Sequence, residues 1–188
     1  ELSFTVLESR SEIGGTWSLF KYPGIRSDSD MSTFGFKFYP WRSSKLIAPG
    51  EEIMEYLRGA VREFDLERHI QFEVRVAEAA WSTPEAKWTL AAESGARYTC
   101  SFLFGCTGYY SHEEPYKPEF PGEADFRGRI VHPQNWGPVD DADYPGKRLA
   151  IIGSGATAIT LLPNLVKGGA KHVTMVQRTP TYIFAGPE

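Results

Sequence analysis

A glycine-rich turn between an apolar strand and an apolar helix constrains the fold of this 188-residue chain more than any other feature. Leu149-Ala150-Ile151-Ile152 is typical of a buried parallel strand and leads directly into the G-x-G-x-x-A sequence that begins at Gly153. The apolar segment 158–166 follows, and 172–177 has the composition of a second strand. Glycines let the backbone approach a pyrophosphate, which the free N–H groups of the helix start attract. The pattern predicts an α/β fold with a Rossmann-like dinucleotide site. Its candidate cofactor-binding residues are Gly153, Ser154, Gly155, Ala156, Thr157, Ala158, Ile159 and Thr160.

The end of the second strand predicts which dinucleotide binds. An Asp or Glu about 20 residues past the first glycine usually accepts a hydrogen bond from the ribose 2′-hydroxyl, whereas an Arg binds a 2′-phosphate. Here the strand ends in Gln177-Arg178-Thr179, without a carboxylate. The Arg178 guanidinium can donate a fork of hydrogen bonds to a phosphate, and the Thr179 hydroxyl can add one. The sequence therefore favours NADPH over NADH. The alternative is that Arg178 is a solvated cation at the strand end.

The N-terminal residues have the composition of another strand of this kind. Residues 3–8 form an apolar run that ends in Glu8, which suits a carboxylate that binds a ribose hydroxyl. The glycine turn that should precede it by about 20 residues is not in the sequence. We therefore expect this chain to be an internal fragment of a longer protein.

Composition is that of an ordinary soluble α/β protein, with 41% hydrophobic residues, 23% charged residues and a net charge of −4. The chain has no basic stripe and no apolar run of about 18 residues, so neither nucleic-acid binding nor a transmembrane segment is expected. The four histidines have no metal-ligand spacing, and Cys100 and Cys106 are expected to be core thiols. We expect a cytoplasmic protein without a metal, and membrane association and oligomeric state stay open.

The remaining pattern predicts two domains. A long loop, 14–50, precedes a helix over 51–64, whose apolar face is expected in the core. Three short strands near 71–76, 87–92 and 97–104 suggest a small meander. A proline-rich connector follows, and we expect the domain boundary near residue 140, with a first domain over 1–140 and a second that begins at 141.

One stretch of the connector resembles a family fingerprint. Residues 126–136 have the form F-x-G-x-x-x-H-x-x-x-W, carried by Phe126, Gly128, His132 and Trp136. This form resembles the fingerprint of the Baeyer-Villiger monooxygenases, which are class B flavoprotein monooxygenases. Further motifs stand in the order of that family, and the stretches 14–31, 154–160 and 171–182 resemble the ethionamide monooxygenase subgroup. The further motifs are Glu8, Gly14-Gly15-Thr16-Trp17, Tyr22-Pro23-Gly24-Ile25-Arg26-Ser27-Asp28, Phe104-Gly105-Cys106-Thr107-Gly108 and the second glycine turn.

The resemblance implies FAD in the first domain and NADP(H) in the second. It implies that Glu8 holds the adenosine ribose of FAD and that the Val76 backbone faces the adenine. Asp28 becomes the acidic group of the active site, whereas local sequence alone favours a turn residue. His132 is expected to couple domain movement rather than to act in the chemistry. The other implied cofactor contacts are Gly14, Gly15, Thr16, Trp17, Ser18 and Leu19 along the flavin and its phosphates, and Arg26 and Ser27 where nicotinamide and flavin meet.

The activity implied by the resemblance is NADPH-dependent oxygenation by a flavoprotein. The family inserts one oxygen atom of O2 beside the carbonyl of a ketone, which gives an ester or lactone, and also oxygenates sulfur compounds. The family's catalytic arginine would lie beyond residue 188, so the isolated chain is expected to be inactive. Two alternatives stay open: a flavin-containing or N-hydroxylating monooxygenase, against which Trp136 argues, and a non-catalytic nucleotide-binding homologue.

Overall fold

The computed structural model describes residues 3–136 and 143–184. The chain divides into two compact units. One contains the residues up to Gly15 together with Leu57–Tyr110, and the other contains Thr16–Tyr56 together with the described residues from Ser111 onward. The boundary expected near residue 140 lies outside the described residues, and the division into an FAD domain and an NADP domain stays a prediction.

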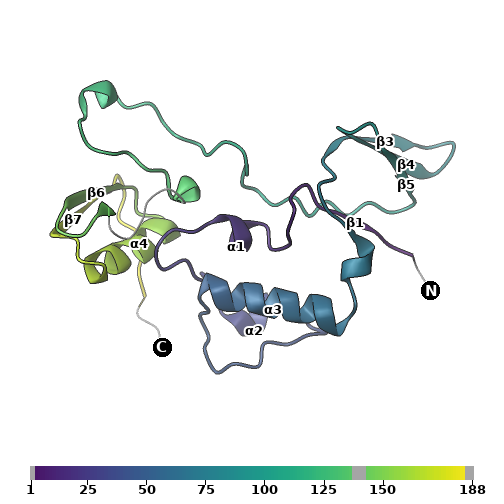
Figure 1. Cartoon of the computed structure of the whole chain (residues 1–188), viewed down its shortest axis with the longest axis horizontal. Coiled ribbons are helices and arrows are strands. Elements are labelled where there is room, and N and C mark those ends of the chain that lie inside the picture. Colours follow the sequence, from purple (N-terminus) through teal and green to yellow (C-terminus); the bar gives the residue numbers. More distant parts are fainter. Residues whose placement is uncertain (1–2, 137–142, 185–188) are drawn as a thin grey trace. The chain divides into compact units, whose positions relative to one another are not determined.

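The first unit holds two small sheets (Figure 1). Strand β1 (Val6–Leu7) pairs in parallel with β2 (Ile70–Gln71), which follows the short 3-10 helix η1 (Glu67–His69). Strands β3 (Val76–Ser82), β4 (Lys87–Ala92) and β5 (Arg97–Cys100) form an antiparallel meander in that order. Trp81 and Trp88 stand opposite each other in the β3–β4 register, with ring centroids 5.5 Å apart, as hairpin packing predicts.

The expected strand over 71–76 is wrong. Its first residue, Gln71, pairs with Leu7 of β1, and the meander begins only at Val76, because the backbone turns between the two sheets. Glu73 has φ +58, a left-handed conformation that interrupts a strand. The next residue, Val74, donates its N–H to the Glu8 carbonyl at 2.9 Å.

The expected strand over 97–104 ends at Cys100. Residues 101–104 belong to no strand, and Phe102 and Phe104 are 78% and 83% exposed. Both cysteines are free thiols, Cys100 half-buried and Cys106 exposed. The expectation of two core thiols is therefore wrong for Cys106, because the segment that carries it is not covered.

The second unit contains the expected long loop, which is more ordered than the sequence suggests. It includes two four-residue helices, α1 (Thr16–Leu19) and α2 (Met31–Phe34), and ends where α3 (Gly50–Glu63) begins. The Tyr56 hydroxyl on α3 accepts a hydrogen bond from Phe36 N–H at 2.6 Å and donates one to the Tyr39 carbonyl. Helix α3 itself confirms the predicted helix. Ile53 and Ala60 are 0% and 2% exposed, whereas Phe64, expected in the core, is 41% exposed at the helix end.

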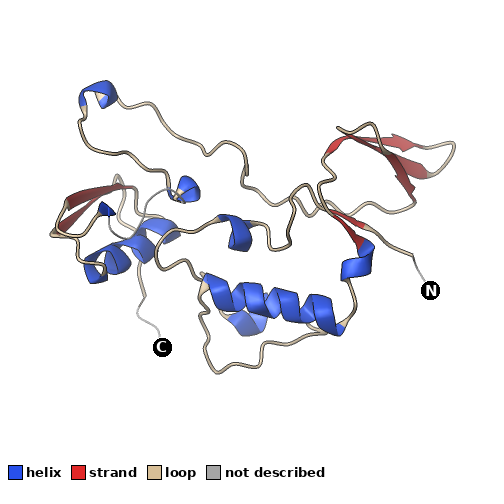
Figure 2. Cartoon of the chain, viewed as in Figure 1, coloured by secondary structure: helices blue, strands red, loops and turns tan. Residues whose placement is uncertain are grey.

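The predicted strand, turn and helix are confirmed in residues 148–176. Strand β6 (Arg148–Ile152) leads through the glycine turn into α4 (Ala156–Lys167), and β7 (His172–Val176) pairs in parallel with β6. Helix α4 lies beside this two-stranded sheet (Figure 2). Burial along β6 alternates, and Ile152 is 66% exposed. The expectation of a fully buried strand is wrong, because α4 covers one face of the sheet.

The core of the second unit joins the segment after α1 to α4. Its buried members are Phe20, Tyr22, Tyr144, Leu161 and Leu165. Trp136 packs against this cluster from the connector, which also carries the 3-10 helices η2 (Glu123–Asp125) and η3 (Pro133–Asn135). In the part of the chain that the structure describes, no helix is both long and apolar enough to cross a bilayer.

Candidate dinucleotide sites

The second glycine turn has the geometry that a pyrophosphate site requires. Gly153 has φ +117, a conformation that favours glycine, and its N–H donates to the Val176 carbonyl at 2.8 Å. Gly155 is the N-cap of the twelve-residue α4 and makes no side-chain cap hydrogen bond. A Cβ atom built on Gly153 or Gly155 would meet no atom within 4 Å. The helix start therefore faces open space with free N–H donors, which fits a bound phosphate.

A hydroxyl network fixes this turn to the residues after β7. Ser154 Oγ donates to the Thr179 carbonyl at 3.3 Å. Thr181 Oγ1 lies 2.7 Å from the Ser154 carbonyl and 2.8 Å from Ser154 Oγ. Sequence analysis missed Thr181, because the contact joins residues 27 positions apart and no periodic pattern marks it. The network connects the glycine turn to the segment that carries Arg178.

Arg178 and Thr179, the predicted 2′-phosphate contacts, follow the end of β7. Val176, the last residue of β7, is the register partner of Ile152, so Arg178 follows the strand end next to the glycine turn. Both side chains are exposed. Within residues 3–136 and 143–184, no hydrogen bond or ion pair engages the Arg178 guanidinium. The guanidinium is thus available to an anionic ligand.

Tyr22 is a buried phenol whose pKa is affected by two predicted site residues, Thr157 and Asp28. Its side chain is 8% exposed. Burial raises the pKa of Tyr22 above its usual value, the Thr157 hydrogen bond opposes this, and the negative charge of Asp28 adds to it. The Thr157 hydroxyl and the Asp28 carboxylate therefore both act on one buried phenol.

The predicted junction residues 26–28 have distinct surroundings. Arg26 and Asp28 are exposed, whereas Ser27 is 2% exposed. Ser27 Oγ accepts the Ala48 N–H at 3.1 Å, and Ser27 N–H donates to the Ala48 carbonyl at 2.9 Å. Ser27 thus holds the segment to the end of the long loop and leaves its two neighbours accessible.

The local turn role that Asp28 could have had belongs to Asp30. Asp30 is the N-cap of α2, and its carboxylate accepts the Thr33 N–H at 2.8 Å and the Thr33 hydroxyl at 2.9 Å. These hydrogen bonds lower the pKa of Asp30. Asp30 therefore caps a helix, whereas the nearby Asp28 is exposed.

The first compact unit contains Glu8, Gly14, Gly15 and Val76. The Glu8 carboxylate accepts the Arg10 N–H at 2.9 Å, and Arg10 Nη1 donates to the Gly15 carbonyl at 3.0 Å. Gly14 and Gly15 have φ +109 and +51. The Glu8 carbonyl also accepts the Val74 N–H, so the segments that contain Glu8 and Val76 are neighbours. Sequence analysis missed Arg10, which ties the acidic strand end to the two glycines.

The other residues expected along the flavin belong to the second unit. Thr16, Trp17, Ser18 and Leu19 form α1. Trp17 packs edge-on against Phe34 with ring centroids 5.8 Å apart, and Ser18 is 4% exposed. The predicted FAD contacts are thus divided between the two units, and their joint role stays a prediction.

Each fingerprint residue has a structural contact. The Phe126 ring lies over Gly128, where an added Cβ would come 2.5 Å from the ring. His132 caps η3, because its Nδ1 accepts the Gln134 N–H at 3.2 Å. The buried Gln134 donates to the Ser111 carbonyl, and Trp136 packs on the core cluster. Gln134 was missed by sequence analysis because it is not one of the four fixed letters of the fingerprint.

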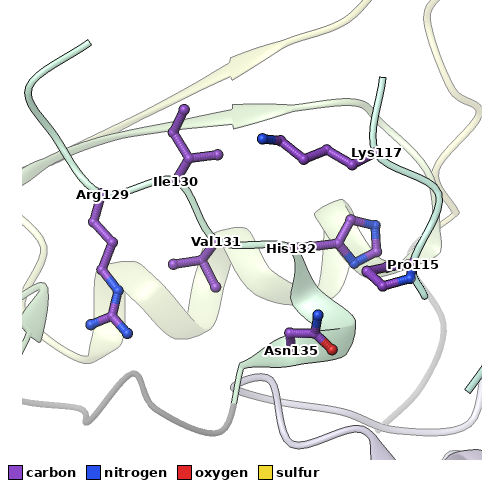
Figure 3. A pocket seen from close by; sticks show the side chains of 7 residues that line it. All are labelled: Pro115, Lys117, Arg129, Ile130, Val131, His132 and Asn135. Atoms are coloured by element: carbon purple, nitrogen blue, oxygen red, sulfur yellow. The ribbon is translucent and has the colours of Figure 1, made fainter. Parts of the chain in front are cut away.

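A cavity of about 270 Å³ is lined by residues of the connector. No residue of the glycine turn lines it. Figure 3 shows the His132 ring beside Pro115, with Ile130 and Val131 from the residues before it. The lysine and the arginine that line the cavity are paired, Lys117 with Glu123 and Arg129 with Asp143. Among the residues that are described, no group of three or more His, Cys, Asp or Glu side chains could hold a metal ion.

Comparison with known proteins identifies the class. Residues 5–186 match the family described as flavin-binding monooxygenase-like, and the chain belongs to that family. It is 54% identical to the FAD-containing monooxygenase EthA of Mycolicibacterium smegmatis over 98% of this chain and 38% of that protein. It is 50% identical to the probable FAD-binding monooxygenase AlmA of Acinetobacter baylyi over 98% of this chain and 37% of that protein. The chain thus spans well under half the length of these relatives.

Solved structures agree with the predicted resemblance to Baeyer-Villiger enzymes. An oxidized steroid monooxygenase bound to NADP superposes with a TM-score of 0.80 and 32% identity, over 96% of this chain and 35% of that one. The OTEMO complex with FAD and NADP superposes with a TM-score of 0.75 and 30% identity, over 94% of this chain and 34% of that one. The resemblance to class B flavoprotein monooxygenases and to the EthA subgroup is confirmed.

Proposed function

We propose that the full-length protein is an FAD- and NADPH-dependent monooxygenase that inserts one oxygen atom of O2 into ketones and oxygenates sulfur compounds. The observation that carries this proposal is the complete fingerprint, whose Trp136 packs on the same core as the helix of the second glycine turn. The names of the relatives support it, since they are FAD-containing monooxygenases, and a neighbouring structure contains both FAD and NADP.

The residues of the second turn would hold NADP(H). The N–H groups at the start of α4 would bind the pyrophosphate, and Arg178 with Thr179 would bind the 2′-phosphate. Thr181 would hold the glycine turn next to the segment that carries Arg178, through its hydrogen bond to Ser154. A cofactor without the 2′-phosphate would lose the Arg178 contact, and this difference is the basis for NADPH specificity.

The residues of the first glycine pair and of α1 would hold FAD. The Glu8 carboxylate would accept a hydrogen bond from a ribose hydroxyl. Gly14 and Gly15 would allow the backbone to approach the cofactor closely. When bound, FAD and NADPH supply the electron transfer that activates O2. Asp28, exposed beside Arg26, would hold or release a proton where nicotinamide and flavin meet.

A non-catalytic homologue is the second candidate. It would bind both nucleotides with the same residues. It would not turn over, because it would lack the catalytic arginine that the family resemblance implies. Binding alone therefore does not separate the two candidates, whereas product formation does.

The test is to purify the full-length protein and to follow NADPH oxidation with a panel of ketones and sulfides. We expect a yellow protein with noncovalent FAD, and esters, lactones or sulfoxides that carry one atom from labelled O2 in mass spectra. NADPH oxidation that yields only peroxide with every substrate would favour the non-catalytic candidate. A folded, colourless protein that cannot be reconstituted with FAD would contradict the proposal.

A further inference from the structure

Arg10 contacts both ends of the segment 8–15, which joins β1 to the first pair of glycines. Its backbone N–H donates to the Glu8 carboxylate at 2.9 Å, and its guanidinium Nη1 donates to the Gly15 carbonyl at 3.0 Å. All three residues belong to the first compact unit. Glu8 and Gly15 are both predicted FAD contacts, so one residue engages two parts of the proposed FAD site.

The backbone of Arg10 is held in place independently of its side chain. The Arg10 carbonyl accepts the Glu73 N–H at 3.1 Å, and the Glu8 carbonyl accepts the Val74 N–H at 2.9 Å. Two hydrogen bonds therefore attach this segment to the residues that follow β2. The guanidinium thus extends to Gly15 from a fixed backbone position.

The guanidinium is also oriented by a carboxylate. Arg10 Nη2 lies 3.4 Å from Glu12 Oε1, and Arg58 Nη2 lies 4.0 Å from Glu12 Oε2. The Arg10 side chain is 23% exposed, whereas that of Arg58 is 55% exposed. The Glu12 carboxylate therefore helps to hold the better covered guanidinium with its Nη1 on the Gly15 carbonyl.

The contact with Gly15 fixes the orientation of one peptide group. Gly14 and Gly15 have φ +109 and +51, and glycine adopts several backbone conformations at low cost. The peptide group after Gly15 can therefore turn unless a side chain holds it. The C=O and N–H of a trans peptide group point in opposite directions. A carbonyl held by Arg10 thus leaves the Thr16 N–H pointing away from the guanidinium.

We propose that Arg10 is a positioning residue for FAD, because it holds the Gly15 carbonyl away from the cofactor and leaves the N–H of the same peptide group to donate to an acceptor oxygen of FAD. This inference rests on the proposed FAD site. Without the guanidinium, the peptide group is free to turn its carbonyl toward the anionic cofactor, where two acceptors repel each other. Arg10 acts through Gly15 and does not itself contact FAD.

The test compares Arg10→Met with wild type in the full-length protein, from which FAD is removed and then titrated back. Methionine keeps much of the side-chain volume and removes every N–H donor. Loss of a charge-assisted hydrogen bond should raise the Kd of FAD about tenfold, as measured by FAD fluorescence. Once loaded with FAD, the variant should oxidise NADPH within about twofold of the wild-type rate, because the change affects binding rather than chemistry.

The effect of FAD on Tm separates positioning from a purely structural role. A ligand stabilises the folded protein by mass action, so a fixed excess of FAD should raise the Tm of Arg10→Met less than that of wild type. A purely structural contact would lower the Tm of the apo and FAD-loaded proteins equally and leave this rise unchanged.

Arg58→Met is the matched control. It removes an exposed guanidinium from the same Glu12 carboxylate without touching Gly15. Because an exposed ion pair contributes little, Arg58→Met should change the Kd of FAD less than about twofold.

The outcomes are distinct. A wild-type Kd in folded Arg10→Met, an unchanged rise in Tm with FAD, or an equal loss of affinity in Arg58→Met would overturn the inference while the proposed function stands. If Arg10→Met fails to fold, Arg10→Lys replaces the planar fork by a single ammonium group. A raised Kd in Arg10→Lys would support the inference, and a wild-type Kd would overturn it. A folded wild-type protein that does not bind FAD would instead refute the proposed function.

Discussion

The two glycine turns of this chain both begin with a glycine of positive φ but are built into the molecule in different ways. Gly153 has φ +117 and Gly14 has φ +109. Gly153 stands in an uninterrupted strand, turn, helix and strand within one compact unit, and a twelve-residue helix follows it. Gly14 is followed by a four-residue helix that belongs to the other compact unit. The residues of the second candidate site therefore belong to one compact unit, whereas those of the proposed first site are divided between the two units.

The contacts of the two turns differ accordingly. At the second turn, the Ser154–Thr181 contact spans 27 positions, but both of its ends belong to one compact unit. At the first turn, Arg10 donates to the Gly15 carbonyl within one unit, whereas α1 belongs to the other unit. We expect variants at the second site to alter binding of one cofactor and variants near Asp28 to alter chemistry.

The largest effect is expected for Asp28→Ala. We expect FAD to stay bound and oxygenation to fall about a hundredfold or more, because a positioned acid or base is removed. Stopped-flow absorbance would follow flavin reduction and reoxidation separately. Asp30→Ala is the matched control, since it removes the α2 cap and should lower Tm modestly while oxygenation continues. Wild-type rates in both steps for Asp28→Ala would show that Asp28 is a turn residue.

Arg178→Ala should have the next largest effect and only on NADPH. Loss of a charge-assisted contact of about 1.5–3 kcal/mol predicts a KM for NADPH raised about ten- to a hundredfold. The KM for NADH should barely change, because NADH has no 2′-phosphate. Steady-state kinetics with both cofactors tests this directly. Equal losses with NADPH and NADH would mean that Arg178 has a structural role.

Thr181→Val should have a smaller effect that does not distinguish the cofactors. It removes the hydroxyl that contacts Ser154 while the shape stays similar. We expect the Kd of NADP+ and of NAD+ to rise by similar factors of about three to ten. Thr181→Ser should bind like wild type. If Thr181→Val weakened NADP+ alone, the hydroxyl would contact the 2′-phosphate rather than position the glycine turn.

The smallest effect concerns pH and the α2 cap. The pKa of Asp30 is lowered from 3.8 in the folded state, so the ionised form favours folding. This stabilisation is fully present above the unfolded pKa of 3.8 and is lost as the pH falls through the lower folded pKa. Asp30→Asn keeps a capping side chain that does not titrate. Thermal unfolding of both proteins below about pH 4 should show a steeper loss for wild type, and parallel curves would contradict this assignment.

The comparison also explains what the sequence could predict. The β6–α4–β7 unit and α3 follow from periodicity and glycine placement, because they depend on neighbouring residues. Residues 71–76 were assigned wrongly, because the sequence does not show that the chain leaves one sheet at Glu73 and joins another at Val76. Phe102 and Phe104 were expected in a strand because the segment is apolar. The expectation was wrong because apolar character alone does not reveal whether another strand pairs with the segment.

In the candidate sites, the sequence predicted residues whose proposed role needs a particular residue type. It did not predict the contacts that position them. Arg178 and Gly153 could be predicted because each proposed chemical role needs that residue type, and their roles stay predictions. Thr181 was missed because its contact joins residues 27 positions apart, and Arg10 was missed because no sequence pattern marks its hydrogen bond to the Gly15 carbonyl. Asp28 and Asp30 could not be distinguished from local sequence, and only the hydrogen bonds of Asp30 separate the two.

The most direct test of the central claim is an anaerobic titration of the full-length yellow protein with NADPH, followed by flavin absorbance. The account predicts that NADPH bleaches the flavin with one equivalent per site, that NADH does so only at far higher concentration, and that Arg178→Ala removes most of this difference. Equal reduction by NADPH and NADH in the wild-type protein would contradict the assignment of the second glycine turn to NADPH.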